Sequence, residues 1–525
     1  MVVVRTNRRP AALAAFASAL LIPTAASAQF TCPKTGGNLV FAQEAKVNSL
    51  DQHTSSTIST RNIAMNMFEA LMTRDENMAP IPELAETVTE APDLMSYTFK
   101  LRQGIKFHNG KEMTTEDVVA SFDRYRKFGI DRGILDVVEK WEAPDKYTFV
   151  ISMKQAQPTF LENFSSFSIP IVIIPKENAD APAMQLKTVG TGPWEFVEFV
   201  ADSHVKIKRF DGYKPNPAFK DINGFGGYKV ACLDTVTFRI VTEAGARVAG
   251  LETGEFHAVE DLPAKAQARL KTNASVVLKP LQNFWVQIAL PNLSLPPTDN
   301  LKVRQAIQAA LDMEEIMEAA TDGAYRLNIG LQYPPQVFAT EIAKHTYNLK
   351  NKELAKKLLA EGGYKGEKLV LLTNKDYSNM YTAALVMAEQ LKAVGINAEL
   401  LVLDWPATVQ KQQNTTDGWN FFFTGYGTNS SLGGIAAWRF HSHPFNTYKP
   451  KDNKPDEEFM KRFNAIANGK TLDERKVAYA ETEKYALEQV LALPFGTLTK
   501  VQAVRSNVEN FRPFRIPRMS NVWMK

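Results

Sequence analysis

The sequence predicts a mixed α/β (α+β) fold with two lobes or more. Strand patterns with a period of two and helical patterns with a period of about 3.6 residues follow one another along most of the chain. The length of 525 residues and the 45% hydrophobic content suffice for more than one hydrophobic core and are too ordinary for a disordered chain. After Lys279 helices and strands alternate regularly, which predicts an α/β lobe with parallel strand pairing.

The first residues have the pattern of a secretory signal peptide. Three arginines precede an apolar stretch over residues 11–22, and a small-residue cleavage site ends at Ala28. The stretch is too short to span a bilayer comfortably, and no later segment approaches about 20 uninterrupted apolar residues. Because no small-residue box directly precedes Cys32, no lipid anchor is expected. We expect residues 1–28 to be removed and the mature protein to be exported and to diffuse freely.

The elements of the mature chain follow from the same patterns. The strands predicted before Lys279 are 39–43, 97–101, 148–153, 205–209 and 233–240, and the helices are 61–71 and 116–128. The strands predicted after it are 284–290, 368–372 and 397–402, and the helices are 301–310, 352–361 and 380–393. From about Leu493 the sequence is extended and rich in turns.

Two cysteines, Cys32 and Cys232, remain after export into an oxidising compartment. We therefore predict a disulfide that pins the mature N-terminus onto the strand 233–240. A catalytic or metal-binding thiol is the alternative, but no CxxC motif or Cys/His cluster lies nearby.

Charge and motifs argue against nucleic-acid binding and against catalysis. The formal net charge is +4, and it becomes +1 once the three arginines of residues 1–28 are lost, since that segment holds no lysine or acidic residue. A nucleic-acid partner normally requires a basic stripe, so none is expected. The chain has no GxSxG elbow, HExxH motif or Walker loop. We expect no enzyme activity and no cofactor, although two converging carboxylates of a hydrolase would leave no short motif.

The stretch from Tyr97 to Tyr125 joins an alternating strand to a tight turn and a capped helix. A second short strand is expected at Ile105 and Phe107, Asn109-Gly110 favours a sharp turn, and Thr114 or Thr115 caps the helix.

This stretch resembles the segment that marks the large periplasmic solute-binding proteins of ABC importers, the peptide/nickel/oligosaccharide-binding family. Three further segments resemble family motifs in the right order: 191–194, 301–312 and 354–364.

The resemblance implies a two-lobed periplasmic binding protein of type II, in the large (cluster C) form. Lobe I is expected to comprise 29–281 together with the returning tail 496–525, and lobe II to comprise 282–495. Two chain crossings, near 278–283 and 495–500, would form a hinge that lets the lobes close around a ligand. A monomer is implied, because one face must remain free for the ABC permease.

Three segments supply candidate ligand-binding residues. His53 and Thr54 occupy the place of a family loop that approaches the ligand from the first lobe, and a solvated loop is the alternative. Trp419, Tyr426 and Asn429 lie where many peptide-binding relatives carry a GWxxD segment, whose aspartate binds the α-ammonium group of a peptide. Residues 421–423 of this segment are expected to form a buried strand.

Asn429 carries no charge and cannot replace that aspartate. No carboxylate lies between Asp417 and Asp452, so recognition of ordinary peptides is in doubt. The expected pocket is dominated by aromatic and neutral polar groups.

His441 and His443 form the third candidate segment, in a predicted loop. Imidazole suits nickel, and some relatives carry nickel complexes, but no third ligand is adjacent. A solvated or hydrogen-bonded histidine pair is the favoured alternative, and no metal site is predicted.

The expected function is that of the periplasmic substrate-binding component of an ABC importer for a peptide-like or other small organic solute. The alternatives are a ligand sensor that docks on a membrane receptor, a nickel-chelate binder and a periplasmic hydrolase.

Overall fold

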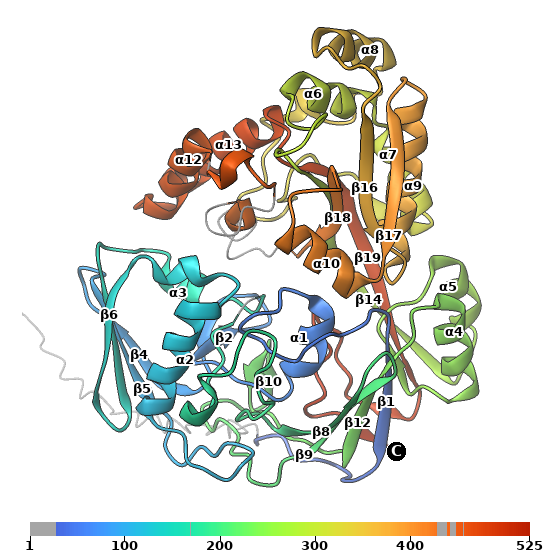
Figure 1. Cartoon of the computed structure of the whole chain (residues 1–525). Coiled ribbons are helices and arrows are strands. Elements are labelled where there is room, and N and C mark those ends of the chain that lie inside the picture. The colour runs from blue at the N-terminus through green and yellow to red at the C-terminus, as the bar shows by residue number, and fades with distance from the viewer. Residues whose placement is uncertain (1–27, 169, 428–437, 442–447, 455) are drawn as a thin grey trace, which may run out of the picture.

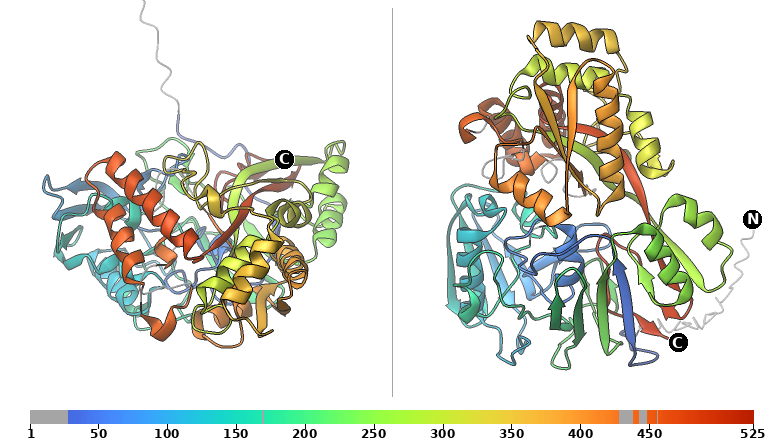
Figure 2. Two further views of the ribbon diagram at one scale, coloured as in Figure 1. Left: turned by 90° about the horizontal axis from the view of Figure 1, so that it is seen from above. Right: turned by 45° about the vertical axis from the view of Figure 1, so that its right-hand side comes forward.

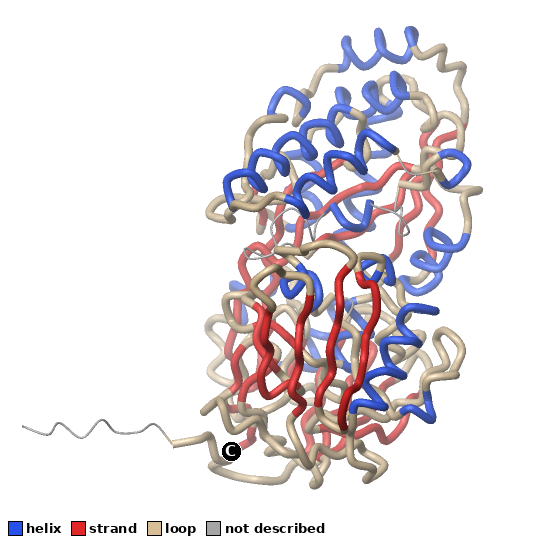
Figure 3. Tube along the Cα trace, turned by 90° about the vertical axis from the view of Figure 1, so that its left-hand side faces the viewer, coloured by secondary structure: helices blue, strands red, loops and turns tan. Residues whose placement is uncertain are grey.

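The computed structural model describes residues 28–168, 170–427, 438–441, 448–454 and 456–525. It contains two lobes (Figure 1), as the sequence predicted. The C-terminus returns to the lobe that contains the start of the described chain (Figures 1 and 2). In the view of Figure 3, strands stand side by side in this lower lobe I, and helices cover much of the upper lobe II. Within the described ranges, no helix has the length and apolar character needed to cross a membrane.

One sheet of 11 strands extends through both lobes. Its centre is the antiparallel pair β14 (Val276–Pro291) and β19 (Leu493–Arg505). The lobe I side continues through β13 (Ala258–Val259), β1 (Asn38–Gln43), β12 (Thr235–Ile240), β9 (His204–Arg209) and β8 (Trp194–Val200). The lobe II side continues through β18 (Phe421–Tyr426), β16 (Lys368–Asn374) and β17 (Asn397–Leu403), and β15 (Tyr325–Arg326) pairs with β19.

Strand pairing in lobe II is only partly parallel. β16 pairs in parallel with β17 and with β18, as predicted. The pairs that β14 forms with β18 and with β19 are antiparallel. The prediction of a parallel lobe was therefore wrong for the strands that connect the lobes, because these strands arrive from lobe I or return to it.

A separate sheet of four strands lies at one end of lobe I. Its strands are β4 (Ala85–Glu90), β5 (Ser96–Leu101), β7 (Thr148–Met153) and β6 (Val138–Asp145), and α2 (Thr115–Phe128) packs against it. The backbone N–H of Thr114 donates to the Asp117 carboxylate over 3.0 Å, which fixes Thr114 as the N-cap of α2. The predicted strand at Ile105 and Phe107 is reduced to an isolated bridge between Lys106 and Glu112.

Helix α1 (Ile58–Ala64) is shorter than the predicted 61–71. Beyond Met65 the backbone bonds to a distant loop, where the N–H of Gly192 donates to the carbonyl of Met67 over 2.9 Å. A Cβ on Gly192 would lie 2.8 Å from that carbonyl oxygen. The close approach explains why a glycine is needed at this position, and why the helix does not continue.

The remaining elements complete the two lobes. The other helices are α3 (Phe160–Phe164), α4 (Ala244–Thr253), α5 (Ala264–Leu270), α6 (Leu301–Ala310), α7 (Met313–Thr321), α8 (Lys352–Glu361), α9 (Ser378–Lys392), α10 (Trp405–Asn414), α12 (Glu457–Asn468) and α13 (Leu472–Glu488). The short strands are β2 (Met72–Arg74), β3 (Pro80–Pro82), β10 (Ile222–Asn223), β11 (Gly226–Gly227), β20 (Val508–Glu509) and β21 (Trp523–Met524). Short 3-10 helices are η1 (Arg132–Leu135), η2 (Lys176–Asn178), η3 (Lys344–Thr346), η4 (Arg439–His441) and η5 (Lys451–Asn453).

The predicted disulfide between Cys32 and Cys232 is present, with a Cα–Cα distance of 5.6 Å. It joins the start of the described chain to the segment that leads into β12. The bridge closes a loop with a sequence separation of 200 residues.

The chain crosses between the lobes within β14 and β19. Pairing of these strands is interrupted between Leu281 and Trp285, and Asn283 within the interruption has a positive φ of 50°. The predicted lobe boundaries at residues 281/282 and 495/496 fall inside these strands and stay predictions. The interruption lies where the predicted hinge was placed.

Candidate functional site

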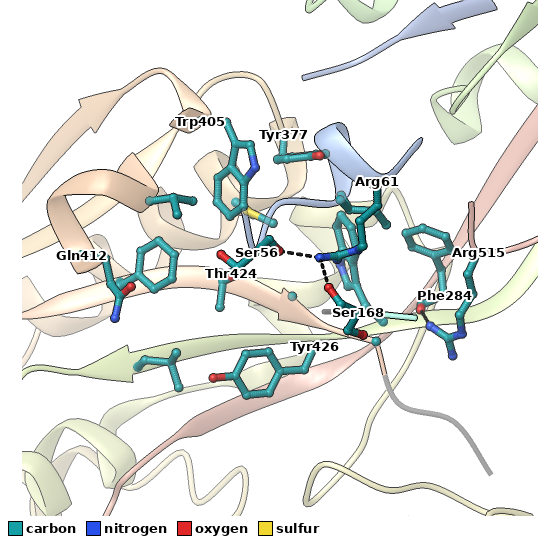
Figure 4. Close-up of a pocket in the computed structure, with 18 of the residues that line it drawn as sticks. Ser56, Arg61, Ser168, Phe284, Tyr377, Trp405, Gln412, Thr424, Tyr426 and Arg515 are labelled. Atoms are coloured by element: carbon teal, nitrogen blue, oxygen red, sulfur yellow. Dashed lines mark hydrogen bonds between the residues drawn. The ribbon is translucent and has the colours of Figure 1, made fainter. Parts of the chain in front are cut away.

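A cavity of about 110 Å³ has walls from both lobes. Its described lining includes Ser56, Ile58, Arg61, Phe167, Ser168 and Arg515 from lobe I, and Phe284, Trp285, Leu290, Tyr377, Met380, Trp405, Val409, Gln412, Gln413, Phe422, Thr424, Gly425, Tyr426 and Gly427 from the lobe II segment (Figure 4). Such apolar clefts between domains, with a few directed polar groups, are typical sites for small ligands.

Aromatic rings form one wall of the cavity. The rings of Trp405 and Phe422 are stacked with their centroids 6.2 Å apart. Tyr377 meets Trp405 edge-on at 5.2 Å, and Trp285 meets Tyr377 in the same way at 5.6 Å. Mutual packing therefore fixes the orientation of these rings before any ligand is bound.

Several polar hydrogens of this wall have no acceptor among the described residues. The Tyr377 hydroxyl and the indole nitrogens of Trp285 and Trp405 are buried without a hydrogen-bond partner. Buried polar groups are normally paired. These groups are therefore candidates for hydrogen bonds to a bound molecule.

Arg61 projects from α1 toward the cavity (Figure 4). Its Nη1 donates to the main-chain carbonyls of Ser56, over 2.7 Å, and Ser168, over 2.8 Å. Burial lowers the pKa of Arg61 to about 10, so the guanidinium is still charged at neutral pH. It forms no ion pair with any carboxylate of the described chain.

A second guanidinium reaches the cavity from the C-terminal tail. Nη1 of Arg515 donates to the main-chain carbonyl of Phe284, so it links the tail to β14. Burial lowers the pKa of Arg515 from its ordinary value. Of the described residues that line the cavity, none is Asp or Glu.

The lobes also meet directly at the edge of the cavity. Nε2 of Gln413 in α10 donates to Oγ of Ser56 over 3.0 Å. Because this bond joins the two walls, the structure corresponds to an arrangement in which the lobes are in contact around the cavity.

Comparison with known proteins assigns the family. The model of the family described as bacterial extracellular solute-binding proteins, family 5 Middle, matches residues 79–448, more than half of the chain. The chain belongs to the family 5 solute-binding proteins. The resemblance found in the sequence is thereby confirmed.

Two curated relatives of this family 5 protein match most of its length. A probable peptide ABC transporter periplasmic-binding protein of Sinorhizobium fredii is 27% identical over 488 residues, which cover 87% of this chain and 88% of that protein. The glutathione-binding protein GsiB of Shigella boydii is 28% identical over 439 residues, which cover 80% of each.

A solved structure shares the fold of this family 5 protein. The dipeptide binding protein from Pseudoalteromonas sp. SM9913, in complex with Met-Leu, has a TM-score of 0.82 at 22% sequence identity. The similarity covers 93% of this chain and 100% of that one.

Of the residues predicted to bind the ligand of this family 5 protein, Tyr426 lines the cavity. Trp419 precedes β18 and is fully buried, with its Nε1 donating to the Thr415 carbonyl over 3.2 Å. Asn429 lies outside the described residues. The binding roles of all three stay predictions.

His53 and Thr54 are buried within lobe I and are not part of the cavity lining. Nε2 of His53 lies 2.8 Å from the carbonyl of Val172, and the Thr54 hydroxyl donates to the sulfur of Met184 over 3.3 Å. Their polar atoms therefore organise the loop at 51–54, which is neither solvated nor open to the cavity. Burial lowers the pKa of His53 to about 4.

His441 is also buried, and its Nε2 lies 3.1 Å from the carbonyl of Leu491. Its ring meets Tyr426 edge-on at 6.1 Å, so it packs behind a cavity residue. His443 lies outside the described residues. In the part of the chain that the structure describes, no three His, Cys, Asp or Glu side chains are grouped to hold a metal ion.

The sequence reading missed Arg61, Trp285, Tyr377 and Trp405 as cavity residues. A sequence signal existed for one of them, because the Trp405-Pro406 pair comes shortly after the predicted strand 397–402 and begins a helix capped by Asp404. Arg61 and Trp285 belong to predicted elements, and Tyr377 directly precedes helix α9, outside the predicted ranges. Nothing in the sequence indicates which of these side chains meet the other lobe.

Proposed function

We propose that this protein is the periplasmic substrate-binding component of an ABC importer. In this function the protein, cleaved after Ala28, binds a small organic solute in the cavity between the lobes. Closure of the lobes buries the solute, and the closed form delivers it to the membrane permease. Membership of family 5 and the names of the two curated relatives support this role.

The observation that carries the proposal is the composition of the cavity wall. Residues from the first quarter of the chain, from lobe II and from the C-terminal tail meet there. A solute bound among them contacts both lobes, so it stabilises the closed form relative to the open one. Capture of the solute and its delivery to a permease then both depend on the equilibrium between the open and closed forms. The protein acts as a monomer and catalyses no reaction.

Peptide-like molecules are the first solutes to test, because the curated relatives are named for peptides and glutathione. The protein should be expressed with its own signal peptide so that it is exported. It should then be purified gently and examined by native mass spectrometry for a bound solute. Uptake of the identified solute should then be measured in the producing bacterium with and without the gene. We expect uptake to require both this protein and an ABC permease.

Tyr426→Ala provides the variant, and Tyr147→Ala, in the turn between β6 and β7, is the matched control. The first should lose bound solute and uptake, and the second should retain both. Solute-dependent signalling that persists without any permease would instead identify a sensor. Turnover of the solute by the purified protein would identify an enzyme.

A further inference from the structure

We propose that Arg61 binds a carboxylate of the solute through the edge formed by its Nε and Nη2 atoms. The inference rests on the proposed function and names the substrate class: an organic acid that has no ammonium group within the cavity.

The hydrogen bonds of Arg61 leave one edge of its guanidinium available. Nη1 is occupied by the carbonyls of Ser56 and Ser168, which fix the plane of the group. Nε is buried and has no acceptor, and no described residue accepts a hydrogen bond from Nη2. The Nε–H and Nη2–H donors are parallel, a geometry that matches the two oxygens of a carboxylate.

The charge of Arg61 is likewise uncompensated. A buried guanidinium is costly unless it is paired, yet the described lining of the cavity holds no Asp or Glu. The neighbours that bond to Arg61 are neutral carbonyls. An anionic solute would supply the missing charge, and it would gain more from the pair than in water because the site is largely shielded from solvent.

The same lining disfavours a cation. A solute ammonium group would enter a cavity that contains two guanidinium groups, Arg61 and Arg515, and no described carboxylate. Like charges in a site of low polarity repel one another. A free α-ammonium group therefore gains nothing here, whereas a blocked amine or an uncharged polar substituent is tolerated.

The aromatic wall defines the body of the solute. The rings of Trp405 and Tyr377 offer apolar surface, and their unpaired N–H and O–H groups can donate to neutral acceptors. The predicted solute is thus an organic acid with a flat or apolar part and further oxygen acceptors. N-acylated amino acids and N-blocked peptides have this chemistry.

Four compounds test the inference: alanyl-phenylalanine, its C-terminal amide and the N-acetylated form of each. Binding should be measured by calorimetry to the wild type, Arg61→Gln, Arg61→Lys and Arg239→Gln. Arg239 is the matched control, a partly buried arginine of β12 that does not line the cavity. N-acetyl-alanyl-phenylalanine should bind the wild type about 10- to 100-fold more tightly than its amide.

Acetylation should not weaken binding of the acids. In Arg61→Gln the preference for acid over amide should fall to about one, in Arg61→Lys it should be intermediate, and in Arg239→Gln it should match the wild type. Since Arg61 also donates hydrogen bonds to the carbonyls of Ser56 and Ser168, its variants can lose stability. The acid-to-amide ratio within one variant does not depend on the folded fraction, and so it still reports the contact.

Equal binding of acid and amide by the wild type would overturn the inference. So would an acid preference that survives in Arg61→Gln, binding that requires the free amine, or failure of both acids to bind at millimolar concentration. The proposed function fails separately: native mass spectrometry then finds no solute and uptake does not depend on the gene. A bound neutral or cationic solute that is taken up would refute only the role of Arg61.

Discussion

Arg439 of lobe II and Asp131 of lobe I form an ion pair, with 2.7 Å between Nε of the guanidinium and Oδ2 of the carboxylate. The two side chains are 9% and 6% exposed. Nη1 of Arg439 also donates to Oδ1 of Asn163 over 3.3 Å. Arg439 thus contacts two positions of the opposite lobe, outside the cavity itself.

Replacing Arg439 should open the lobes. In Arg439→Gln the buried Asp131 carboxylate loses its cation, a change that typically costs about 3–5 kcal/mol for a buried pair. We expect a larger radius of gyration in small-angle X-ray scattering of the ligand-free protein. Arg132→Gln, an exposed arginine beside Asp131, is the control and should have the wild-type radius.

Protonation of Asp131 should reverse that opening. Burial raises the pKa of Asp131 to about 6 in the present structure, and a hydrated carboxylate in an open form would have a lower pKa. The closed form therefore binds a proton more readily, so closure of Arg439→Gln should recover as the pH falls from 7 to 5. The double variant Asp131→Asn/Arg439→Gln should be closed at pH 7. An open double variant would contradict this explanation.

The buried histidines should destabilise the fold in acid. Burial lowers the pKa of His53 to about 4 and that of His441 to about 3, below the ordinary value of 6.5. The unfolded chain then binds more protons than the folded chain below pH 6.5, so the free energy of unfolding falls as the pH decreases. Each histidine contributes at most about 1.4 kcal/mol per pH unit.

The contribution of His441 can be isolated by comparison of wild type and His441→Gln. Buried Glu44 and Glu483, whose pKa values burial raises to about 7, act in the opposite direction in both proteins and cancel in the difference. Denaturation at pH 7, 6 and 5 should give a smaller loss of unfolding free energy for the variant. Parallel curves for the two proteins would rule out the contribution.

Loss of the disulfide should lower stability without changing solute affinity. Cys232→Ser should decrease the free energy of unfolding by about 2–4 kcal/mol, because the bridge restricts the unfolded chain over a long loop. Urea denaturation measures the loss, and a reducing agent should produce it in the wild type but not in the variant. Neither cysteine lines the cavity, so a large change in solute affinity would indicate a structural link that the fold does not reveal.

Gly425 should tolerate no side chain. A Cβ at this position would lie 2.6 Å from the ring of Trp285, so Gly425→Ala should displace an aromatic residue of the cavity wall. We expect about 1–3 kcal/mol lower stability, as for overpacked cores, and weaker solute binding in the same calorimetric assay. Gly245→Ala in α4 is the control, because its Cβ would meet nothing within 4 Å. Equal affinities for both variants would show that Trp285 does not contact the solute.

Local patterns predicted the regular elements well. Helices α6 and α8 begin and end as expected, because Asn300 and Asn351 cap them and their apolar periodicity is strong. The prediction of the helix 61–71 was wrong, because contacts with a distant loop determine the structure there. The apolar residues after α1 continue a helical pattern, but the backbone there forms a hydrogen bond with a loop around Gly192.

The site was less predictable than the fold. Tyr426 and Trp419 lie seven positions apart in one predicted segment, yet Tyr426 lines the cavity and Trp419 is fully buried outside its lining. Arg61 appeared only as part of a helical pattern. Its significance comes from acceptors at Ser56 and Ser168 and from the absence of a carboxylate in the described lining, and such relations exist only after the lobes are assembled.

The shared strands β14 and β19 restrict how the lobes can move. A connection made of flexible loops would permit rotation in many directions, but two hydrogen-bonded neighbours in one sheet hold each other in register. The interruption between Leu281 and Trp285 is the place where backbone torsions can change while few pairing bonds are lost. Substitutions at 282–284 should therefore alter the rate and the extent of lobe movement even where they leave every solute contact in place. Variation in this short segment gives evolution a way to adjust transport speed separately from selectivity.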